Sequence, residues 1–349
     1  MQNELMTAAV FHQPENIVIG KVPVPQLSKD EVLVSVRAAA ICGTDIRIYL
    51  GKKTKGVRLP SILGHEISGE IVETGTSIQG YKAGDRVIIA PVIACGQCYY
   101  CKHGLSNVCT NRTAFGYEYD GGFAEYIKLP YQAIQAGNLI HLPENISYEE
   151  GCIIEPLSCC IRSHRKMPID IDEKVLVVGA GPIGLMHVKL LKRIGVNLIV
   201  VSEPNTERRI LAQETGADIV VNPLETDLEN MIKKETNGLG IDKIIVATSV
   251  PKVIHELMHC LRKGGQICLF AGMGAKVEQF DVDLIHYNEL SICGTSAARI
   301  EDFQTAIQYI TNNEISIKDL ITKKFHLEQI ELAINYVMSG NGLKTLLTI

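Results

Sequence analysis

The sequence of 349 residues has no excess of positive charge: 34 lysine and arginine residues face 39 acidic ones, which gives a net charge of −5. A nucleic acid or an anionic membrane surface attracts proteins through a basic field, so neither is an expected partner. Long apolar runs are also missing, because no uninterrupted stretch reaches the roughly 20 residues that span a bilayer. Tryptophan is absent, and the remaining composition, 46% hydrophobic and 21% charged, is that of an ordinary globular protein.

A secretory leader is not expected either. The N-terminal stretch MQNELMTAAVFHQPENIVIG has no basic region followed by a long apolar run, so it does not resemble a signal peptide. We therefore expect a cytoplasmic protein whose cysteines stay as thiols or metal ligands, because a reducing compartment disfavours disulfides. Cysteines outside the candidate metal sites lie mostly in apolar strings, where small buried hydrophobic side chains are expected: Cys152, Cys159, Cys160, Cys260, Cys268 and Cys293.

Two patterns divide the chain, whose length suggests two domains. The first 150 residues carry short β-like runs between turns, which predicts a compact and mostly antiparallel β unit. From about Lys174, apolar strands alternate with helical segments, which predicts a parallel sheet covered on both faces. Within this alternation VIHELMHCLRKGG (253–265) is expected to be a helix and QICLFAG (266–272) a strand. Past Gly294, a helix and a closing segment are expected to rejoin the first domain.

A glycine-rich turn between a strand and a helix carries the pattern G-x-G-x-x-G at Gly179, Gly181 and Gly184. Such a turn lets a pyrophosphate approach the backbone and lets the helix pack closely on the strand. Glu203 ends the next strand, where a carboxylate accepts hydrogen bonds from the ribose hydroxyls and repels a 2′-phosphate, which favours NAD over NADP. A tight structural turn with a solvated Glu203 is the alternative. Arg208 could instead pair with a phosphate or stack on adenine.

Four cysteines with the spacing C-x2-C-x2-C-x7-C lie in the loop CGQCYYCKHGLSNVC. Four thiolates complete a tetrahedron around zinc, so this loop predicts a closed, structural zinc site at Cys95, Cys98, Cys101 and Cys109. His103 lies within the loop and is expected at the surface, because the tetrahedron is already complete.

A second set of metal-ligand residues is scattered along the chain. Cys42, His65 and Glu155 each have an ordinary structural explanation when taken alone. Together with the run Gly64-His65-Glu66-x-x-Gly69-x5-Gly75-x-x-Ile78, the four-cysteine loop and the glycine-rich turn, they stand in the order found in one family. Over essentially its whole length the chain resembles the zinc-dependent medium-chain dehydrogenase/reductase family.

This resemblance implies an α/β protein with a Rossmann doubly wound parallel sheet and a GroES-like, mostly β catalytic domain. The catalytic domain is expected at 1–156, the NAD-binding Rossmann domain at 157–296, and a C-terminal segment that rejoins the catalytic domain at 297–349. Relatives are commonly dimers or tetramers, so a homodimer or homotetramer is expected.

The resemblance also implies the roles of site residues. Cys42, His65 and Glu155 look like the ligands of a catalytic zinc, and Glu66 looks like an alternate ligand or a carboxylate behind the ligands. Two zinc ions per chain and NAD are the expected cofactors. The positions that match cofactor contacts are Gly179, Gly181, Pro182, Ile183, Gly184, Glu203, Arg208, Ala271, Gly272 and Met273.

Residues for proton transfer and substrate binding are implied less directly. Thr44 resembles the hydroxyl of the family's proton relay, although a turn-capping threonine is the alternative. Arg47 stands where the family usually has a histidine, and arginine cannot act as a general base near neutral pH. It could instead bind the cofactor pyrophosphate or a substrate phosphate. Tyr49, Phe115 and Tyr117 fall in segments that approach the substrate in relatives, and core packing explains Phe115 equally well.

Glu155 within the run EPL and the acid at Glu203 look most like the polyol (sorbitol) dehydrogenase branch. The expected function is zinc- and NAD-dependent oxidation of a secondary hydroxyl on a polyol, sugar-alcohol phosphate or sugar acid. Oxidation of L-threonine at its 3-hydroxyl is the alternative within the same class. A non-catalytic zinc-binding module is the alternative from another class.

Overall fold

The computed structural model describes residues 4–274 and 280–349. It divides into two compact units, one formed by Met1–Ser158 with Ala297–Ile349 and the other by Cys159–Ser296. No helix in the described ranges is long and apolar enough to cross a membrane.

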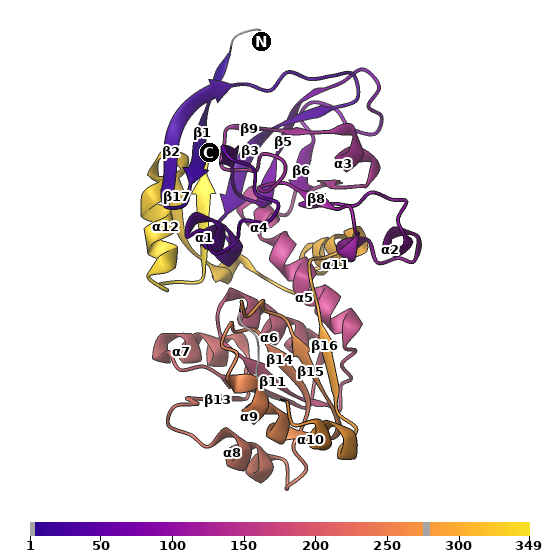
Figure 1. Cartoon of the computed structure of the whole chain (residues 1–349), viewed down its shortest axis with the longest axis vertical. Coiled ribbons are helices and arrows are strands. Elements are labelled where there is room, and N and C mark those ends of the chain that lie inside the picture. Colours follow the sequence, from indigo (N-terminus) through magenta and orange to yellow (C-terminus); the bar gives the residue numbers. More distant parts are fainter. Residues whose placement is uncertain (1–3, 275–279) are drawn as a thin grey trace. The chain divides into compact units, whose positions relative to one another are not determined.

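The first unit is built mostly on antiparallel strands, which come from both ends of the chain (Figure 1), and only β17 and β18 pair in parallel among its described strands. One sheet has the order β2-β1-β4, and a larger one has the order β10-β6-β5-β3-β18-β17, with β9 also paired to β3. Its strands are β1 (Leu5–Gln13), β2 (Asn16–Pro23), β3 (Val32–Ala40), β4 (Ser61–Ile62), β5 (Glu66–Thr74), β6 (Arg86–Ile89), β7 (Val92–Ile93), β8 (Thr113–Ala114), β9 (Tyr126–Leu129), β10 (Leu139–His141), β17 (Ile321–His326) and β18 (Lys344–Thr348).

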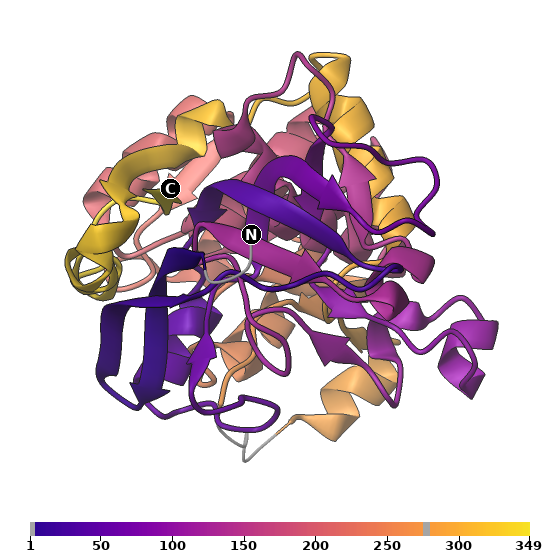
Figure 2. The same ribbon diagram turned by 90° about the horizontal axis from the view of Figure 1, so that it is seen from above.

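Short helices connect these strands. They are α1 (Gly43–Tyr49), α2 (Tyr99–Lys102), α3 (Tyr131–Gln135), α4 (Tyr148–Cys152), α11 (Ile300–Thr311) and α12 (Ile330–Met338), with 3₁₀ turns η1 (Ser106–Val108), η2 (Lys318–Leu320) and η3 (Leu327–Gln329). Helix α5 (Ile154–Lys166) begins in this unit and continues into the second, which starts at Cys159. The loop that carries α2 extends away from the strands of this unit (Figure 2).

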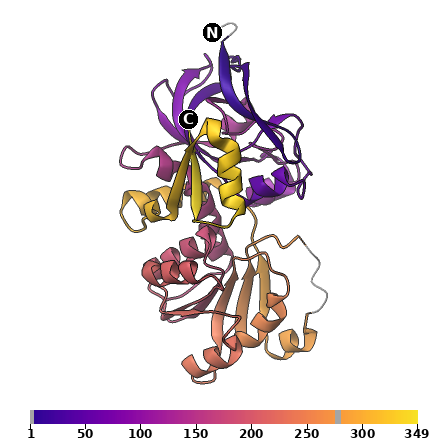
Figure 3. The same ribbon diagram turned by 90° about the vertical axis from the view of Figure 1, so that its left-hand side faces the viewer.

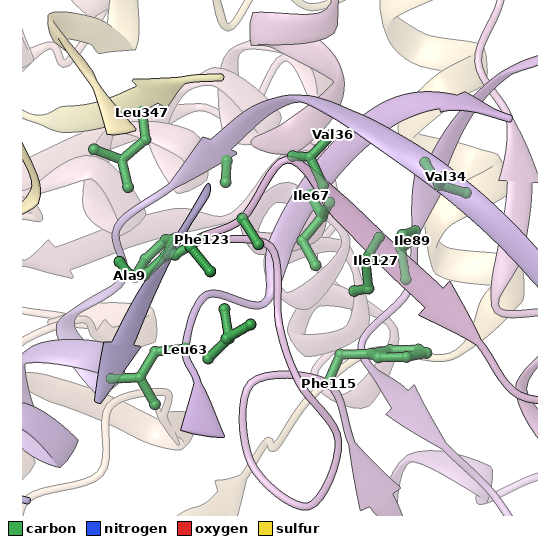
Figure 4. Close-up of a cluster of buried hydrophobic side chains, with 14 of the residues drawn as sticks. Ala9, Val34, Val36, Leu63, Ile67, Ile89, Phe115, Phe123, Ile127 and Leu347 are labelled. Atoms are coloured by element: carbon green, nitrogen blue, oxygen red, sulfur yellow. The ribbon is translucent and has the colours of Figure 1, made fainter. Parts of the chain in front are cut away.

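The core of the first unit explains why β3 lies at the centre of its sheet. Val34 and Val36 of β3, Ile67 of β5 and Ile127 of β9 are all buried in one apolar cluster (Figure 4). β3 pairs with β5 and β9, and the C-terminal β18 pairs antiparallel with β3 as well. The last residues of the chain therefore complete the larger sheet, whose strand β3 comes from the N-terminal part of the chain, and the yellow strands in Figure 3 are these C-terminal ones.

The second unit contains a parallel sheet with the strand order β13-β12-β11-β14-β15-β16, and helices lie on both of its faces (Figure 3). Its elements are β11 (Lys174–Val178), α6 (Pro182–Ile194), β12 (Leu198–Ser202), α7 (Thr206–Thr215), β13 (Ile219–Val221), α8 (Leu228–Glu235), β14 (Ile241–Val246), α9 (Val253–Cys260), β15 (Leu261–Leu269), α10 (Val282–Tyr287) and β16 (Ser291–Gly294). The continuously apolar strands are buried on both faces, as the pattern predicted.

One boundary in this unit was predicted wrongly. The sequence predicted a helix to about residue 265, whereas α9 ends at Cys260 and β15 begins at Leu261. Leu261 pairs with Ile241, and a bulge follows before Lys243 pairs with Gln266. Gly264, with a φ of +72°, lies within this irregular part of the strand. Pairing with β14 thus outweighs the helical pattern of the sequence.

Candidate functional site

Strand pairing brings the scattered metal-ligand residues together. Ala40, at the end of β3, pairs with Glu66, at the start of β5. Cys42 lies just beyond β3 and His65 just before β5, so this pairing places both beside Glu66. One ligand atom from each of Cys42, His65 and Glu66 lies within 4.8 Å of the other two, as a metal-binding group requires.

The backbone before His65 is fixed by a close approach. Gly64 has a φ of +90°, and a Cβ on it would lie 2.4 Å from the ring of Phe123. A larger residue would have to displace this buried ring or strain the backbone. Glycine at this position therefore helps to hold His65 at the edge of the sheet.

Asp45 organises two of the candidate ligands, although the sequence did not single it out. Its Oδ1 lies 3.2 Å from Nδ1 of His65, and its Oδ2 accepts a hydrogen bond from the backbone N–H of Cys42 at 2.8 Å. A carboxylate at one ring nitrogen fixes the imidazole and leaves the other nitrogen for a metal. In the sequence, Asp45 could have been found as an acid at the third position of the helix that follows Cys42.

The electrostatics of His65 favour a bound cation. Burial alone lowers the pKa of His65, but interactions with Tyr117, Asp45 and Cys42 raise it, and the resulting pKa is well above the ordinary value. These surroundings favour positive charge at the imidazole. A metal cation competes with the proton for the same nitrogen.

Glu66 is held by a lysine from the end of the chain. Nζ of Lys344 lies 2.5 Å from both carboxylate oxygens of Glu66, and both side chains are buried. Burial lowers the pKa of Lys344, but Glu66 more than offsets this effect, so that the pKa is raised and the lysine stays charged. The sequence analysis missed Lys344. Its ammonium competes with a metal for the carboxylate of Glu66.

Glu155 lies in the first turn of α5 and does not belong to the group of ligand atoms within 4.8 Å of one another. Its charge nevertheless raises the pKa of both Tyr117 and Lys344, so it lies close to the same site. The choice between Glu66 and Glu155 as the third zinc ligand therefore stays a prediction.

Tyr117 connects the imidazole to a cationic surface. Its ring centroid lies 5.5 Å from that of His65, and Nζ of Lys53 lies 4.5 Å from the Tyr117 centroid. Burial raises the pKa of the Tyr117 hydroxyl, so this group stays protonated. Burial also lowers the pKa of Lys53, as do the positive charges of Arg112 and Arg47, while Glu118 opposes them. We call Arg47, Lys53 and Arg112 the cationic group.

Two of the predicted substrate residues pack in the core of the first unit. Phe115 is completely buried there (Figure 4), which supports the alternative of core packing, and its role as a substrate residue stays a prediction. The hydroxyl of Tyr49 donates to the carbonyl of Glu15 at 3.3 Å, and its ring packs against the same core. Thr44 lies half-buried in the first turn of α1, two residues from Cys42.

The four-cysteine loop has the geometry of a closed metal site. Sγ atoms of neighbouring pairs lie 3.4 Å apart for Cys95 and Cys109, 3.5 Å for Cys98 and Cys101, and 3.7 Å for Cys98 and Cys109. Zinc–sulfur bonds of about 2.3 Å in a tetrahedron place sulfurs about 3.8 Å apart, so the loop is preformed for zinc. Backbone hydrogen bonds lower the pKa of Cys98 to about 5, which favours the thiolate. His103 instead stacks on Tyr99.

Loss of this zinc is expected to reduce stability before it reduces activity. Cys98→Ser leaves three thiolates, and we expect the thermal midpoint to fall by roughly 5 to 15 °C, because structural zinc contributes folding energy directly. Differential scanning fluorimetry with zinc analysis measures both effects, and kcat at 25 °C should stay within about threefold per folded molecule. His103→Ala is the matched control and should change neither quantity. An unchanged midpoint in Cys98→Ser protein that has lost zinc would refute the structural role.

The glycine-rich turn joins β11 to α6 with the close packing that its spacing predicts. A Cβ on Gly184 would lie 1.8 Å from the carbonyl oxygen of Gly179, so no larger residue fits there. Gly181 precedes α6, and Pro182 occupies the first helical position. The free backbone N–H groups of a helix start favour the phosphates of a dinucleotide.

The side chain of Glu203 lies next to this turn and is buried. Its carboxylate accepts hydrogen bonds from the N–H groups of Ala180 at 2.8 Å and Asn205 at 2.9 Å, which orient it. Nη1 of Arg208 lies 4.0 Å from the position of a Cβ on Gly181, so its guanidinium faces the turn. The alternative of a tight structural turn expected a solvated Glu203, but Glu203 is buried.

The remaining predicted cofactor positions lie in the same unit. Ile183 is in the first turn of α6, where its carbonyl accepts a contact from Sγ of Cys160 at 3.9 Å. Ala271 follows β15, and its N–H bonds to the carbonyl of Val246 at 3.2 Å. Gly272 and Met273 come next, before the end of the described range, and Met273 packs against the apolar core of the second unit.

Comparisons with known proteins agree with this geometry. The family model "Alcohol dehydrogenase GroES-like domain" matches residues 28–143, and "Zinc-binding dehydrogenase" matches 182–312. The chain is 32% identical over 327 residues to D-arabitol-phosphate dehydrogenase of Enterococcus avium, which covers 93% of this chain and 91% of the relative. It is 33% identical to L-threonine 3-dehydrogenase of Pyrococcus furiosus, covering 97% of each. A structure of the alcohol dehydrogenase rspB from E. coli CFT073 with NADH superposes with a TM-score of 0.91, at 30% identity and 99% coverage of both chains.

The fold and the two metal-binding groups define a zinc-dependent dehydrogenase. The chain belongs to the zinc-containing medium-chain alcohol dehydrogenase family and is an enzyme that acts on CH–OH donors. The predicted family, fold class and enzyme class are thereby confirmed, and the alternative of a non-catalytic zinc-binding module is not supported.

Proposed function

We propose that this enzyme uses NAD to oxidise a secondary hydroxyl of a polyol derivative that carries a negative charge, a sugar-alcohol phosphate or a sugar acid, to the ketone. The observation that carries the proposal is the cationic group beside the candidate metal ligands. Lys53 lies over the ring of Tyr117, and this ring lies against His65. The positive charge of Lys53 is therefore separated from the imidazole of His65 by the Tyr117 ring.

The donor set of Cys42, His65 and a carboxylate suits a catalytic zinc. Zinc held there supplies Lewis acidity, which lowers the pKa of a substrate hydroxyl, and NAD supplies the hydride acceptor. The chain's own residues fix the geometry: Asp45 orients the imidazole of His65 and also holds the backbone of Cys42. This orientation sets the position of the reacting hydroxyl.

Proton removal is proposed to start at Thr44. A threonine hydroxyl both accepts and donates a hydrogen bond, so it can pass a proton on without changing its charge. Arg47 is permanently charged and cannot receive that proton. We assign Arg47 to anion binding with Lys53, which leaves the ribose hydroxyls of the cofactor or solvent as the end of the relay.

NAD is the proposed cofactor because Glu203 is fixed at the end of β12 with its carboxylate oriented by two backbone N–H groups. A negative charge at this position repels a 2′-phosphate. The NADH bound in the rspB structure is consistent with this choice. Arg208, which could pair with a phosphate, faces the same turn. The rate with NAD should therefore be compared with the rate with NADP.

The anionic part of the substrate is proposed to bind the cationic group. Arg47 and Lys53 are half-buried, and burial together with the positive charges of Arg112 and Arg47 lowers the pKa of Lys53, whereas Glu118 raises it. An incoming phosphate or carboxylate relieves this repulsion among like charges. The relative named D-arabitol-phosphate dehydrogenase has a substrate of this kind in its name.

A substrate panel tests the proposal. NADH absorbance is followed with neutral polyols, polyol phosphates, sugar acids and L-threonine, and with NADP in place of NAD. We expect the highest kcat/KM with a polyol phosphate or sugar acid and NAD. Lys53→Met should lower kcat/KM about 10- to 100-fold for the charged substrate, because a charge-assisted hydrogen bond contributes about 1.5–3 kcal/mol.

Lys55→Met is the matched control, because Lys55 is an exposed lysine of the same loop. It should change kcat/KM for the charged substrate less than about threefold. Equal kcat/KM for neutral and charged polyols, or equal effects of the two lysine variants, would remove the anion-binding proposal. Better reduction of NADP than NAD would remove the cofactor proposal.

L-Threonine is the second candidate substrate. It is favoured by the 33% identity to L-threonine 3-dehydrogenase over nearly the whole chain. Its carboxylate would also pair with the cationic group. The panel separates the two, since a threonine enzyme should show a kcat/KM for L-threonine above that for every polyol derivative.

Three further assignments are proposed with this function. The catalytic domain comprises 1–156 with 297–349, and the NAD-binding domain comprises 157–296. The active protein is a homodimer or homotetramer. A cytoplasmic location completes the proposal.

A further inference from the structure

Two cysteines of the second unit face each other across neighbouring strands. Cys268 of β15 pairs directly with Cys293 of β16 in a parallel register. Directly paired residues of parallel strands point to the same face of a sheet and have Cα atoms about 4.8 Å apart. This separation falls within the roughly 4.4–6.8 Å that a disulfide requires.

The two thiols already interact. Each thiol shifts the pKa of the other: Cys268 lowers that of Cys293, and Cys293 raises that of Cys268. Cys268 is completely buried, whereas Cys293 is half-buried and has some exposed surface. This arrangement presents one accessible sulfur with a second sulfur directly behind it.

Nearby charges favour a reactive thiolate at Cys293. The neighbouring Cys268 lowers the pKa of Cys293, burial opposes this, and the positive charges of Lys166 and Lys243 lower it further. Cys293 and burial raise the pKa of Cys268. Thiolates near lysines are the ones that peroxides oxidise first.

We propose that Cys268 and Cys293 form an oxidation site, at which a peroxide converts the two thiols into an intramolecular disulfide. The thiolate of Cys293 attacks one peroxide oxygen, which gives a sulfenic acid and releases the other oxygen as water after protonation. The sulfur of Cys268 then attacks the sulfenic sulfur, forms the S–S bond and releases a second water. Both sulfurs are oxidised by one electron each, and hydrogen peroxide is reduced by two.

Other cysteines of the described chain are placed differently. The thiol of Cys152 donates to the carbonyl of Glu149 at 3.2 Å, and that of Cys260 donates to the carbonyl of Glu256 at 3.8 Å. Burial raises the pKa of both thiols, so neither favours the thiolate that would begin the reaction with peroxide. The cysteines of the two metal-binding groups are protected when they hold zinc.

Oxidation would tie an edge strand to its neighbour. β16 is the last strand of its sheet and pairs with β15. A disulfide between them closes the chain segment from 268 to 293 and restrains the edge of the sheet against local opening. Cys268 and Cys293 are not among the proposed substrate and cofactor residues, so this inference does not depend on the proposed function.

The experiment treats the zinc-loaded full-length protein with hydrogen peroxide, blocks remaining thiols with N-ethylmaleimide and digests without reduction. We expect mass spectrometry to find a peptide pair joined through Cys268 and Cys293 that dithiothreitol separates. Cys293→Ser should remove the cross-link. Cys268→Ser should also remove it and leave a sulfenic acid at Cys293 that dimedone traps.

Cys260→Ser is the matched control and should keep the cross-link at the level of the parent protein. Zinc content is measured in parallel, so that oxidation of the zinc ligands is recognised. Full labelling of both Cys268 and Cys293 by N-ethylmaleimide in unfolded, peroxide-treated protein would overturn the proposal. A cross-link that forms at the same rate between other cysteines would overturn it too.

Discussion

Cys42→Ser protein is expected to contain one zinc ion per chain instead of two and to lose at least about 1,000-fold in kcat/KM. The physical reason is that a serine hydroxyl does not ionise near neutral pH, whereas a cysteine thiolate both binds zinc and offsets its charge. Zinc contributes several kcal/mol to the stabilisation of a developing alkoxide, and each 1.4 kcal/mol corresponds to about a factor of ten in rate. Zinc analysis and steady-state kinetics on purified protein give both numbers.

Cys152→Ser is the control for this prediction. Cys152 is another buried thiol of the first unit, and it bonds to the carbonyl of Glu149, which a serine hydroxyl can also do. We expect it to keep two zinc ions and activity within about threefold of the parent protein. Two zinc ions in active Cys42→Ser protein would refute the assignment of Cys42 as a ligand.

Lys344→Met protein is expected to be less stable by about 3–5 kcal/mol in urea unfolding. The substitution leaves the carboxylate of Glu66 buried without its cation, and breaking a buried ion pair from one side carries a penalty of this size. Lys344→Met with Glu66→Gln removes both charges and should recover more than half of the loss. The urea midpoint and its slope supply the comparison.

An exposed ion pair of the same unit provides the matched control. Lys324 lies 2.9 Å from Glu149, and both side chains are substantially exposed. Lys324→Met should cost less than about 1 kcal/mol, because solvent screens such pairs. Similar losses in the two lysine variants would show that burial of the Lys344 pair has no special consequence. Zinc content in the double variant also bears on the third ligand: two ions favour Glu155, and one favours Glu66.

Local patterns in the sequence predicted most of the fold. Apolar strands and amphipathic helices gave the parallel sheet, because each element carries its own periodicity. The helix end near Leu261 was predicted wrongly because local periodicity does not decide the structure there. Residues 261–265 continue a helical pattern, but pairing with β14 from residue 241 onward decides their conformation, and such long-range pairing leaves no local trace.

The candidate site was predictable to the extent that its residues are neighbours in sequence. All four cysteines of the structural zinc site lie in one loop, so their spacing alone predicted the site. Cys42 and His65 became recognisable only through the family pattern, since strand pairing brings them together. Lys344 lies 278 residues from Glu66, and a single lysine in an apolar tail gives no signal of its own. The sequence left Phe115 open between substrate binding and core packing, because an aromatic residue near a site looks the same whether it lines the site or fills the core.

The pairing of β18 with β3 has a consequence for the order in which the protein is made. The second unit is one continuous segment, Cys159–Ser296, so all of its strands are synthesised before the last 50 or so residues of the chain. The sheet of the first unit is completed later, because its central strand β3 pairs with β18, which is translated last. Until Lys344 emerges, Glu66 has no buried cation, and the carboxylate beside Cys42 and His65 remains unpaired. During biosynthesis, the sheet of the first unit is therefore completed after all strands of the second unit have been made, although its central strand is among the earlier residues translated.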